Sequence, residues 1–189
     1  MNFDSRIFDF LYEAQQRFAK DDMLAAKING EWKKYSTNQV VETVNKLSAA
    51  LLKLGLSGND MNIERQDKIA IISRNRPEWL MLDLACQQVG IALCPIYPTT
   101  NVKELEFIFN EASIQYVFIS GKEILDKVEG IRNYCPALKD IYSFDELKGA
   151  ISWDRLLSEP DAESKQQVEN WKSKIKAEHC ATIIYTSGT

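Results

Sequence analysis

The sequence predicts an α/β fold in which a mostly parallel sheet carries helices on both faces. Short, continuous apolar runs recur along the chain, and strands buried on both faces of a parallel sheet have this composition. The segments between the runs show apolar residues at helical spacing. Alternating strands and helices favour a parallel sheet with right-handed crossovers. The strands are expected at 69–72, 92–96, 116–119, 141–144 and 181–185.

The region ahead of this sheet, residues 1–66, is expected to form two helices and a hairpin. The hairpin is expected at 28–35, because Asn29-Gly30 separates two short extended runs and favours a tight turn. Ser36 and Gln39 have the spacing of a capping box for the second helix. The first helix has an apolar face formed by Ile7, Leu11, Ala14 and Phe18, and the second by Val40, Val44, Leu47, Leu51 and Leu54.

The second helix is expected to stop at Gly55, and the polar residues 56–66 that follow are expected to form a poorly ordered loop. Later, Pro77 is suited to the first turn of a helix that carries Trp79. We expect Trp79 to be buried, because apolar residues share its helix face. These residues are Leu82, Cys86 and Val89.

Two more helices are expected within the α/β core, residues 67–150. Asn101 and Glu104 form a second capping box ahead of one of them. The apolar face of that helix is Leu105, Ile108, Phe109 and Ala112, and the face of the other is Ile124, Val128 and Ile131. Residues 151–180 are expected to be a helical segment, with a short helix near Trp153 and a mostly solvated one near Val168.

Composition and charge exclude several classes of function. Apolar residues make up 45% of the chain and charged residues 26%, which is typical of a folded domain. The net charge is −4, and no block of like charges marks a nucleic-acid surface, so we expect no nucleic-acid partner. The longest apolar helix is too short to span a bilayer.

The cysteines and the single histidine do not suggest a metal or redox site. No two of Cys86, Cys94, Cys135 and Cys180 form a C-x-x-C pair. We interpret them as buried, reduced thiols, which predicts a cytoplasmic protein. His179 precedes an apolar strand and is interpreted as a residue at the start of that strand. No catalytic residue and no metal ligand is therefore assigned.

The candidate site is at the end of the chain, where Thr186, Ser187, Gly188 and Thr189 follow an apolar strand. Ligands bind beyond the carboxyl ends of the strands in an open parallel sheet. Hydroxyl donors and the close backbone approach that glycine allows are suited to a phosphate. By spacing alone, an ordinary turn is the more frequent explanation of such a segment.

Two other loops at strand ends have weaker claims. Arg74 or Arg76 could face an anion, but a strand-to-helix turn that starts at Pro77 explains the segment without a ligand. Two prolines stiffen the loop around Tyr97, which is either a tyrosine facing a substrate or, as we favour, one packed against the loop.

Several segments together resemble the adenylate-forming acyl-CoA synthetases, and most closely the bacterial long-chain fatty-acid–CoA ligases. The resemblance covers nearly the whole chain. The family's signature loop begins Tyr-Thr-Ser-Gly-Thr and continues to Pro-Lys-Gly, whereas this sequence stops at Thr189. The residues before the last strand, Glu178-His179-Cys180, depart from the family pattern. The segments that carry the resemblance are 67–73, 75–79, 95–99 and 181–189.

The resemblance implies an N-terminal AMP-binding subdomain of an enzyme that uses ATP, Mg²⁺ and coenzyme A. Such an enzyme joins a fatty acid to coenzyme A through acyl-AMP, and residues 181–189 supply a strand and the start of its phosphate loop. The chain is then a truncated piece that is inactive alone. Its last strand is expected to form an exposed apolar edge, to detach, or to pair with a second copy.

The alternative function is a stand-alone nucleotide-binding or interaction module without catalysis. Peripheral membrane association of the longer protein is left open.

Overall fold

The computed structural model describes residues 5–28 and 30–186. Its centre is a five-stranded sheet in the order β4-β3-β5-β6-β7, and every neighbouring pair is parallel. This confirms the predicted mostly parallel sheet. The strands are β3 (Lys68–Ile72), β4 (Ala92–Pro95), β5 (Tyr116–Ile119), β6 (Asp140–Ser143) and the unpredicted, two-residue β7 (Ile151–Ser152).

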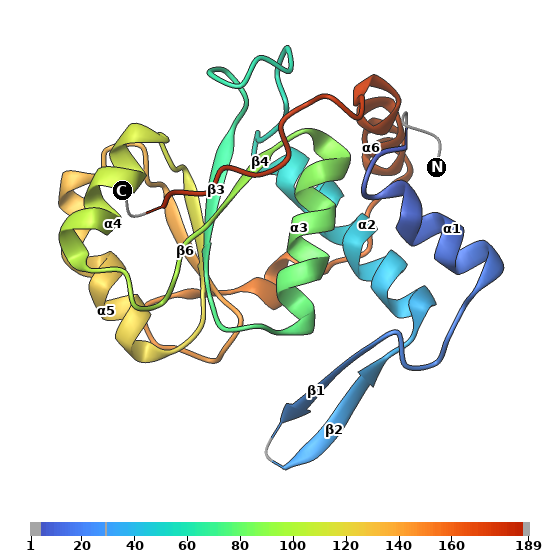
Figure 1. Cartoon of the computed structure of the whole chain (residues 1–189), viewed down its shortest axis with the longest axis horizontal. Helices are drawn as coiled ribbons and strands as arrows, with labels where there is room; N and C mark the ends of the chain where they lie inside the picture. The colour runs from blue at the N-terminus through green and yellow to red at the C-terminus, as the bar shows by residue number, and fades with distance from the viewer. Residues whose placement is uncertain (1–4, 29, 187–189) are drawn as a thin grey trace.

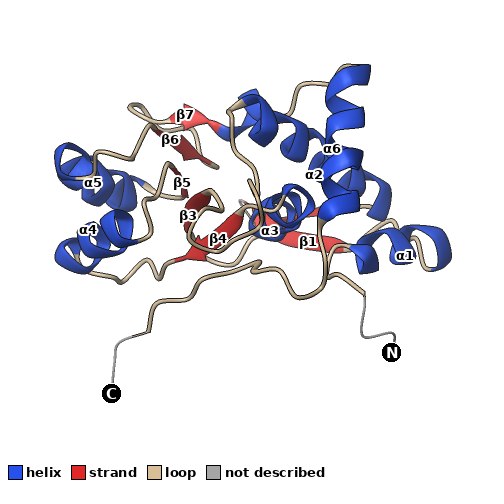
Figure 2. Ribbon diagram, turned by 90° about the horizontal axis from the view of Figure 1, so that it is seen from above, coloured by secondary structure: helices blue, strands red, loops and turns tan. Residues whose placement is uncertain are grey.

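Helices cover both faces of the sheet (Figures 1 and 2). The connections of β3 to β4 and of β4 to β5 run in opposite directions across the sheet. Right-handed crossovers therefore place their helices on opposite faces. One layer holds α1 (Asp9–Arg17), α2 (Thr37–Lys53), α3 (Pro77–Val89) and α6 (Ala162–Lys174), and the other holds α4 (Val102–Glu111) and α5 (Lys122–Ile131).

The sheet separates two hydrophobic cores, and the strands divide their side chains between them. In β3, Ile69 and Ile71 belong to the core beneath α2 and α3, whereas Ala70 and Ile72 belong to the core beneath α4 and α5. Alternate side chains of a strand point to opposite faces. A strand between two cores therefore needs apolar residues at consecutive positions. Such uninterrupted apolar runs are the pattern that predicted the strands from the sequence.

The hairpin and the cap of α2 form as predicted. β1 (Leu24–Ile28) and β2 (Glu31–Tyr35) are antiparallel and joined by a two-residue turn that includes Gly30. Asn29 lies outside the described residues. Ser36 and Gln39 exchange both bonds of the capping box. The 3₁₀ turns are η1 (Arg132–Tyr134) and η2 (Trp153–Leu156). Residues 151–180 contain β7, η2 and α6.

Two predicted apolar faces need correction. Helix α1 begins at Asp9, so Ile7 and Phe18 lie outside it and are 59% and 60% exposed. Leu11 is buried as predicted, and Phe8, which was not predicted, is buried with it. Trp79 packs against the first core but is only partly buried. Helical side chains lean toward the helix N-terminus, so a side chain in the first turn leans past the end of the helix.

The predicted strand at 181–185 is reduced to a single parallel bridge between Leu93 and Thr182. Two backbone hydrogen bonds form this bridge. The Leu93 amide donates to the Ala181 carbonyl (3.0 Å), and the Ile183 amide donates to the Leu93 carbonyl (2.9 Å). The segment runs along the outer side of β4, and Ile184 is 64% exposed. The exposure of Ile184 agrees with the predicted apolar edge, and pairing with a second copy stays a prediction.

The loop 56–66 is not the loosely held segment that its polarity suggested. Leu56 is fully buried, and the Gly58 amide donates to the Val89 carbonyl (2.8 Å). A Cβ atom on Gly90 would lie 2.9 Å from the Gly58 Cα atom, so the two backbones are in direct contact. Gly90 also has φ +76°, which caps α3 in the left-handed conformation. The glycines therefore let the loop pack on the α3–β4 turn.

This contact predicts opposite effects for two glycine substitutions. Gly90→Ala should lower the free energy of unfolding by about 1–3 kcal/mol, through left-handed strain and the clash with Gly58. Gly130→Ala, in α5 with no atom near its added Cβ, should raise it by up to about 1 kcal/mol. Urea unfolding of both variants tests the pair, and equal effects would contradict both the left-handed strain at Gly90 and its clash with Gly58.

Candidate functional site

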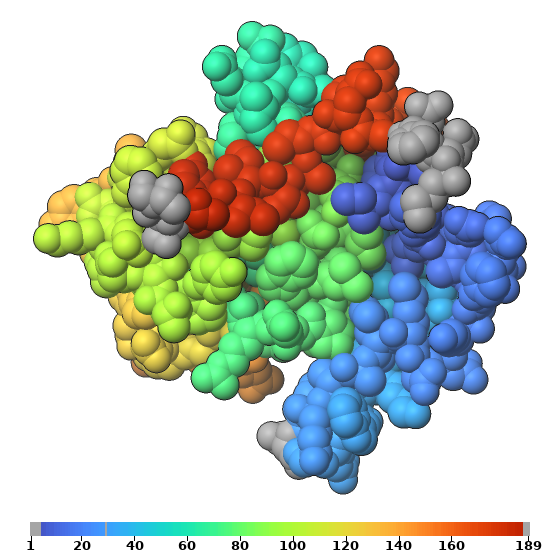
Figure 3. Space-filling view, in the orientation of Figure 1, coloured from blue at the N-terminus to red at the C-terminus, as the bar shows by residue number. Residues whose placement is uncertain are grey.

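A cleft opens beyond the carboxyl end of β4, between α4 and the C-terminal segment. Its volume is about 610 Å³. Figure 3 shows the C-terminal segment lying across this side of the molecule and reaching the residues of α4. The cleft is on the carboxyl-end side of the sheet, the side on which open parallel sheets bind their ligands. The lining residues are Tyr97, Thr99, Thr100, Glu104, Phe107, Ile108, Ile184, Tyr185 and Thr186.

The cleft combines apolar surface with hydroxyl groups. Tyr97 and Phe107 are 74% and 63% exposed, although large aromatic side chains are usually buried. The hydroxyls belong to the lining threonines and tyrosines, and the carboxylate of Glu104 also lines the cleft. Such a mixture suits a ligand with one apolar and one polar part.

Tyr97 contradicts our preference for a packed tyrosine. The Thr100 amide donates to the Tyr97 carbonyl (3.0 Å), which closes a turn between Pro95 and α4. Tyr97 lines the cleft and is largely exposed, so it is not packed against the loop. Phe107 was missed by the sequence reasoning. Its signal was available, because it is the aromatic residue outside the apolar face of α4.

Of the four residues predicted for phosphate binding, Thr186 is at the mouth of this cleft and exposed. Ser187, Gly188 and Thr189 lie outside the described residues. The structure therefore brings the start of the predicted loop next to the end of β4. The bridge between Leu93 and Thr182 fixes this placement, since it aligns the segment parallel to β4.

At the carboxyl ends of β3 and β5, which lie side by side, the arginine of the loop after β3 is engaged by other protein groups. The Arg76 guanidinium donates to Glu78 (2.9 Å) and to Asp145 (2.9 Å) and lies over the Phe144 ring. Asp145 also accepts the Gly121 amide at the start of α5 (2.9 Å). This supports the interpretation of the segment as a strand-to-helix turn and not an anion site.

Glu78 is the most buried member of this network, at 5% exposed. Burial alone would raise the pKa of its carboxyl group. Hydrogen bonds from Arg76, from its own backbone amide and from the Tyr35 hydroxyl outweigh that effect and hold the pKa below its usual range. The Tyr35 hydroxyl donates at 2.9 Å, so the network also joins the hairpin to the start of α3.

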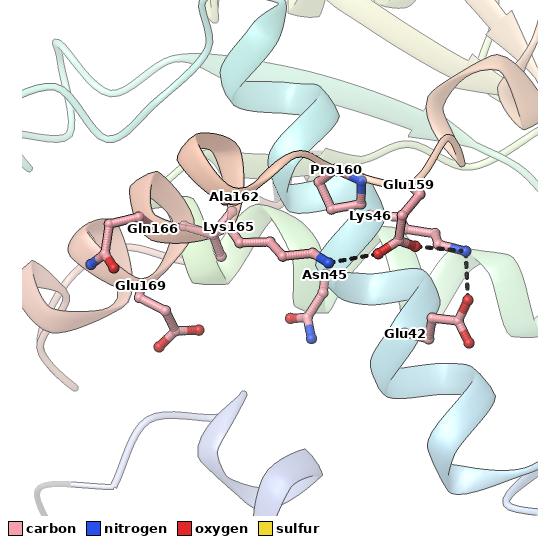
Figure 4. Close-up of a pocket in the computed structure, with 10 residues that line it drawn as sticks. Glu42, Asn45, Lys46, Glu159, Pro160, Ala162, Lys165, Gln166 and Glu169 are labelled. Carbon is pink, nitrogen blue, oxygen red and sulfur yellow. Dashed lines mark hydrogen bonds and ion pairs between the residues drawn. The ribbon is translucent and has the colours of Figure 1, made fainter.

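A second cleft, of about 510 Å³, lies between α2 and α6 (Figure 4). Lys46 and Lys165 both contact the Glu159 carboxylate, at 3.5 and 2.7 Å, and Lys46 also contacts Glu42. Its lysines are thus already neutralised by carboxylates. Exposed pairs of this kind contribute little energy, and we interpret the cleft as the seam where α6 packs on α2.

Two of the thiols are unsuited to catalysis. Cys86 is fully buried, and burial raises the pKa of its thiol well above the usual range. Burial likewise raises the pKa of Cys94 to about 12. The thiolate is the nucleophile and the metal ligand. His179 accepts the Lys176 amide at Nδ1 (3.0 Å) within a turn. Among the described residues, no cluster of acidic, histidine and cysteine side chains could hold a metal ion.

No helix in the described part of the chain has the length and apolarity needed to cross a membrane.

Solved structures with the same architecture define the class of fold. A red-emitting luciferase from Phrixothrix hirtus matches 96% of this chain and 33% of its own, with a TM-score of 0.71 and 21% identity. The anthranilate CoA ligase AuaEII, in complex with anthranoyl-AMP, matches 100% and 32%, with a TM-score of 0.67 and 16% identity. The fold is that of the N-terminal domain of adenylate-forming enzymes.

The profile of the AMP-binding enzyme family matches residues 12–189, and the chain belongs to that family. A human long-chain-fatty-acid–CoA ligase is 27% identical over 190 residues, covering 96% of this chain and 27% of the relative. Long chain acyl-CoA synthetase 4 of Arabidopsis thaliana is 27% identical over 196 residues, covering 96% and 28%. The chain thus spans about a quarter of the length of these relatives. The predicted leaning toward bacterial ligases is not confirmed by these two.

The Glu78 network predicts a pH-dependent contribution to stability. Folding lowers the pKa of Glu78, so its stabilising effect is present above the usual value of 4.5 and is lost as the pH falls through the folded-state pKa. Glu78→Gln should lower the free energy of unfolding by about 2 kcal/mol at neutral pH. The difference from the parent should shrink below pH 4.5.

Urea unfolding at several pH values measures this difference. Glu42→Gln is the control, because Glu42 forms an exposed pair with Lys46, and its effect should stay below about 0.5 kcal/mol. A Glu78 effect that is constant down to acid pH would contradict the lowered pKa.

Proposed function

We propose that the full-length protein joins a fatty acid, of the long-chain class, to coenzyme A at the expense of ATP. The observation that carries this is the family match over residues 12–189, which ends in the sequence Tyr-Thr-Ser-Gly-Thr. The first two residues of that sequence, Tyr185 and Thr186, line the β4 cleft. The long-chain class rests on the two relatives named above, which are described as long-chain enzymes.

The proposed reaction has two steps. The fatty-acid carboxylate attacks the α-phosphorus of ATP, which forms acyl-AMP and releases pyrophosphate. The thiol of coenzyme A then attacks the acyl carbon and releases AMP. The first step brings negative charges together, so the site needs hydrogen-bond donors around the phosphates. Mg²⁺, when bound, would neutralise part of that charge.

Thr186 is the described residue that fits this need. Its side chain is exposed at the mouth of the cleft, next to the end of β4. We assign to it, with Ser187, Gly188 and Thr189, the start of the loop that holds the phosphates. The neighbouring rings of Tyr97 and Phe107 supply apolar surface that is suited to the non-polar part of a ligand. No group in the described cleft is assigned as a general acid or base.

Other features of the proposal concern the cell and the rest of the protein. Buried thiols in Cys86, Cys94 and Cys135 are consistent with a reducing compartment, and we propose a cytoplasmic protein. Because the relatives are about four times as long as this chain, we propose that residues 1–189 alone do not catalyse the reaction. The exposed segment at 181–186 is where we expect self-association.

The role of Thr186 predicts a kinetic effect in a full-length protein carrying this chain. Thr186→Ala should slow fatty-acid-dependent exchange of pyrophosphate into ATP by about 10²–10³-fold, as expected when one transition-state donor is lost. Thr182→Ala makes the same substitution on the same segment outside the cleft and should leave the rate unchanged. If both variants exchange at the parent rate, the Thr186 hydroxyl has no role in phosphate binding.

The alternative function, a stand-alone nucleotide-binding module, is tested with residues 1–189 alone. Calorimetric titration with Mg-ATP should show no binding tighter than about millimolar, because too few donors are present to oppose the triphosphate charge. Far-UV circular dichroism confirms that the titrated chain is folded. Micromolar binding would favour the module.

A further inference from the structure

Gln66 links two parts of the chain that are distant in sequence. Its side-chain Nε2 donates to the Gly90 carbonyl (2.8 Å) and to the Cys180 carbonyl (3.0 Å). Gln66 ends the loop 56–66, Gly90 caps α3, and Cys180 begins the segment that leads to Thr186. The side chain is only 2% exposed. A single buried amide therefore holds the C-terminal segment against the α3–β4 turn.

The amide of Gln66 suits this position. Both partners are carbonyl oxygens, so the side chain must present two N–H donors to them. Within the described residues, the Gln66 Oε1 atom has no hydrogen-bond partner. The reversed amide would place this oxygen against two other oxygens. The orientation is thus set by the two carbonyls, and the stabilisation comes from the donors.

Few other polar contacts hold the start of the segment. The Leu93–Thr182 bridge supplies two backbone hydrogen bonds, at Ala181 and Ile183. Beyond Ile183 the chain continues to Thr186 with Ile184 exposed. Gln66 adds a third attachment at Cys180, immediately before the bridge. Loss of this attachment should allow the segment to open from β4.

We call the two hydrogen bonds from the Gln66 side chain, to Gly90 and to Cys180, the clamp. The loop 56–66 that carries Gln66 is itself held by hydrogen bonds. The backbone amide of Gln66 donates to the backbone carbonyl of Asn62 (2.8 Å), and the backbone amide of Ser57 donates to the Asp67 carboxylate (2.8 Å). The contact between Gly58 and Gly90 also packs the loop against the α3–β4 turn, to which the Gln66 side chain binds. In Figure 1 this loop stands above the sheet, and the C-terminal segment passes beneath it on its way to α4.

We propose that Gln66 is a positioning residue for the phosphate-binding segment. It holds the Cys180 carbonyl so that residues 181–186 stay aligned with β4 and Thr186 stays at the cleft. The clamp itself follows from the contacts above. Only its purpose, the placement of a phosphate-binding loop, rests on the proposed function.

Hydrogen exchange measured by NMR on residues 1–189 tests the clamp. In Gln66→Leu, the amides of Leu93 and Ile183 should exchange about 10–100-fold faster, because two buried donors that restrain the segment are lost. The Ile96 amide, which donates to Ile71 within the sheet, should keep its rate. Gln66→Met is made in parallel, so that the test survives if one variant fails to fold.

Gln88→Leu is the matched control. Gln88 is also fully buried, and it bonds to the Tyr12 and Ser48 hydroxyls between α1, α2 and α3, away from the segment. It should destabilise the whole fold without selective exchange at Leu93 and Ile183. If the Gln66 variants show uniform acceleration like this control, or no acceleration, the clamp is refuted.

A second measurement addresses the purpose of the clamp. In the full-length protein, Gln66→Leu should raise the KM for ATP at least 10-fold in the pyrophosphate exchange assay while leaving the KM for the fatty acid unchanged. An unchanged KM for ATP in an active enzyme would overturn the positioning role. Absence of pyrophosphate exchange in the unsubstituted protein would instead overturn the proposed function. The hydrogen-exchange measurement on residues 1–189 would then decide whether the clamp exists.

Discussion

Burial of β3 on both faces is the constraint on which the structure depends. Its apolar residues, Ile69 to Ile72, are at most 1% exposed, so each face needs its own cover of helices. Its backbone must be paired on both sides, because unpaired buried amides are costly, and β4 and β5 supply that pairing. Right-handed crossovers then place α3 on one face and α4 and α5 on the other. The positions of both cores and of every strand end follow from this arrangement.

The same arrangement explains why the candidate site is at the edge of the sheet. A sheet that is built outward in both directions from one strand normally leaves a crevice between two strand ends. Here Arg76 fills that crevice with its ion pairs to Glu78 and Asp145. Beyond the end of β4 there is a cleft lined by Tyr97 and Phe107, which are exposed. The C-terminal segment approaches this end because it runs parallel to β4.

The segment at the cleft is held by contacts from parts of the chain that carry no ligand-binding signal of their own. Gly58 and Gly90 allow the loop 56–66 to contact the α3–β4 turn, and Gln66 extends that contact to Cys180. A polar loop thereby contributes to the placement of Thr186, although it is distant from the cleft. The energetic reason is that a bridge of two backbone hydrogen bonds is weak, whereas a third, buried attachment restrains the start of the segment.

The sequence by itself determined the parallel sheet, the order of its helices and the capped start of α2, because these depend on local apolar patterns and on capping chemistry between neighbouring residues. It also carried the family resemblance that the profile match confirms. Only the tertiary structure decided that Tyr97 faces a cleft, that 181–185 forms a single bridge, and that Gln66 is buried. These features depend on contacts between residues far apart in the chain, such as Gln66 with Cys180, and no local pattern reports which polar side chain will meet a distant backbone carbonyl.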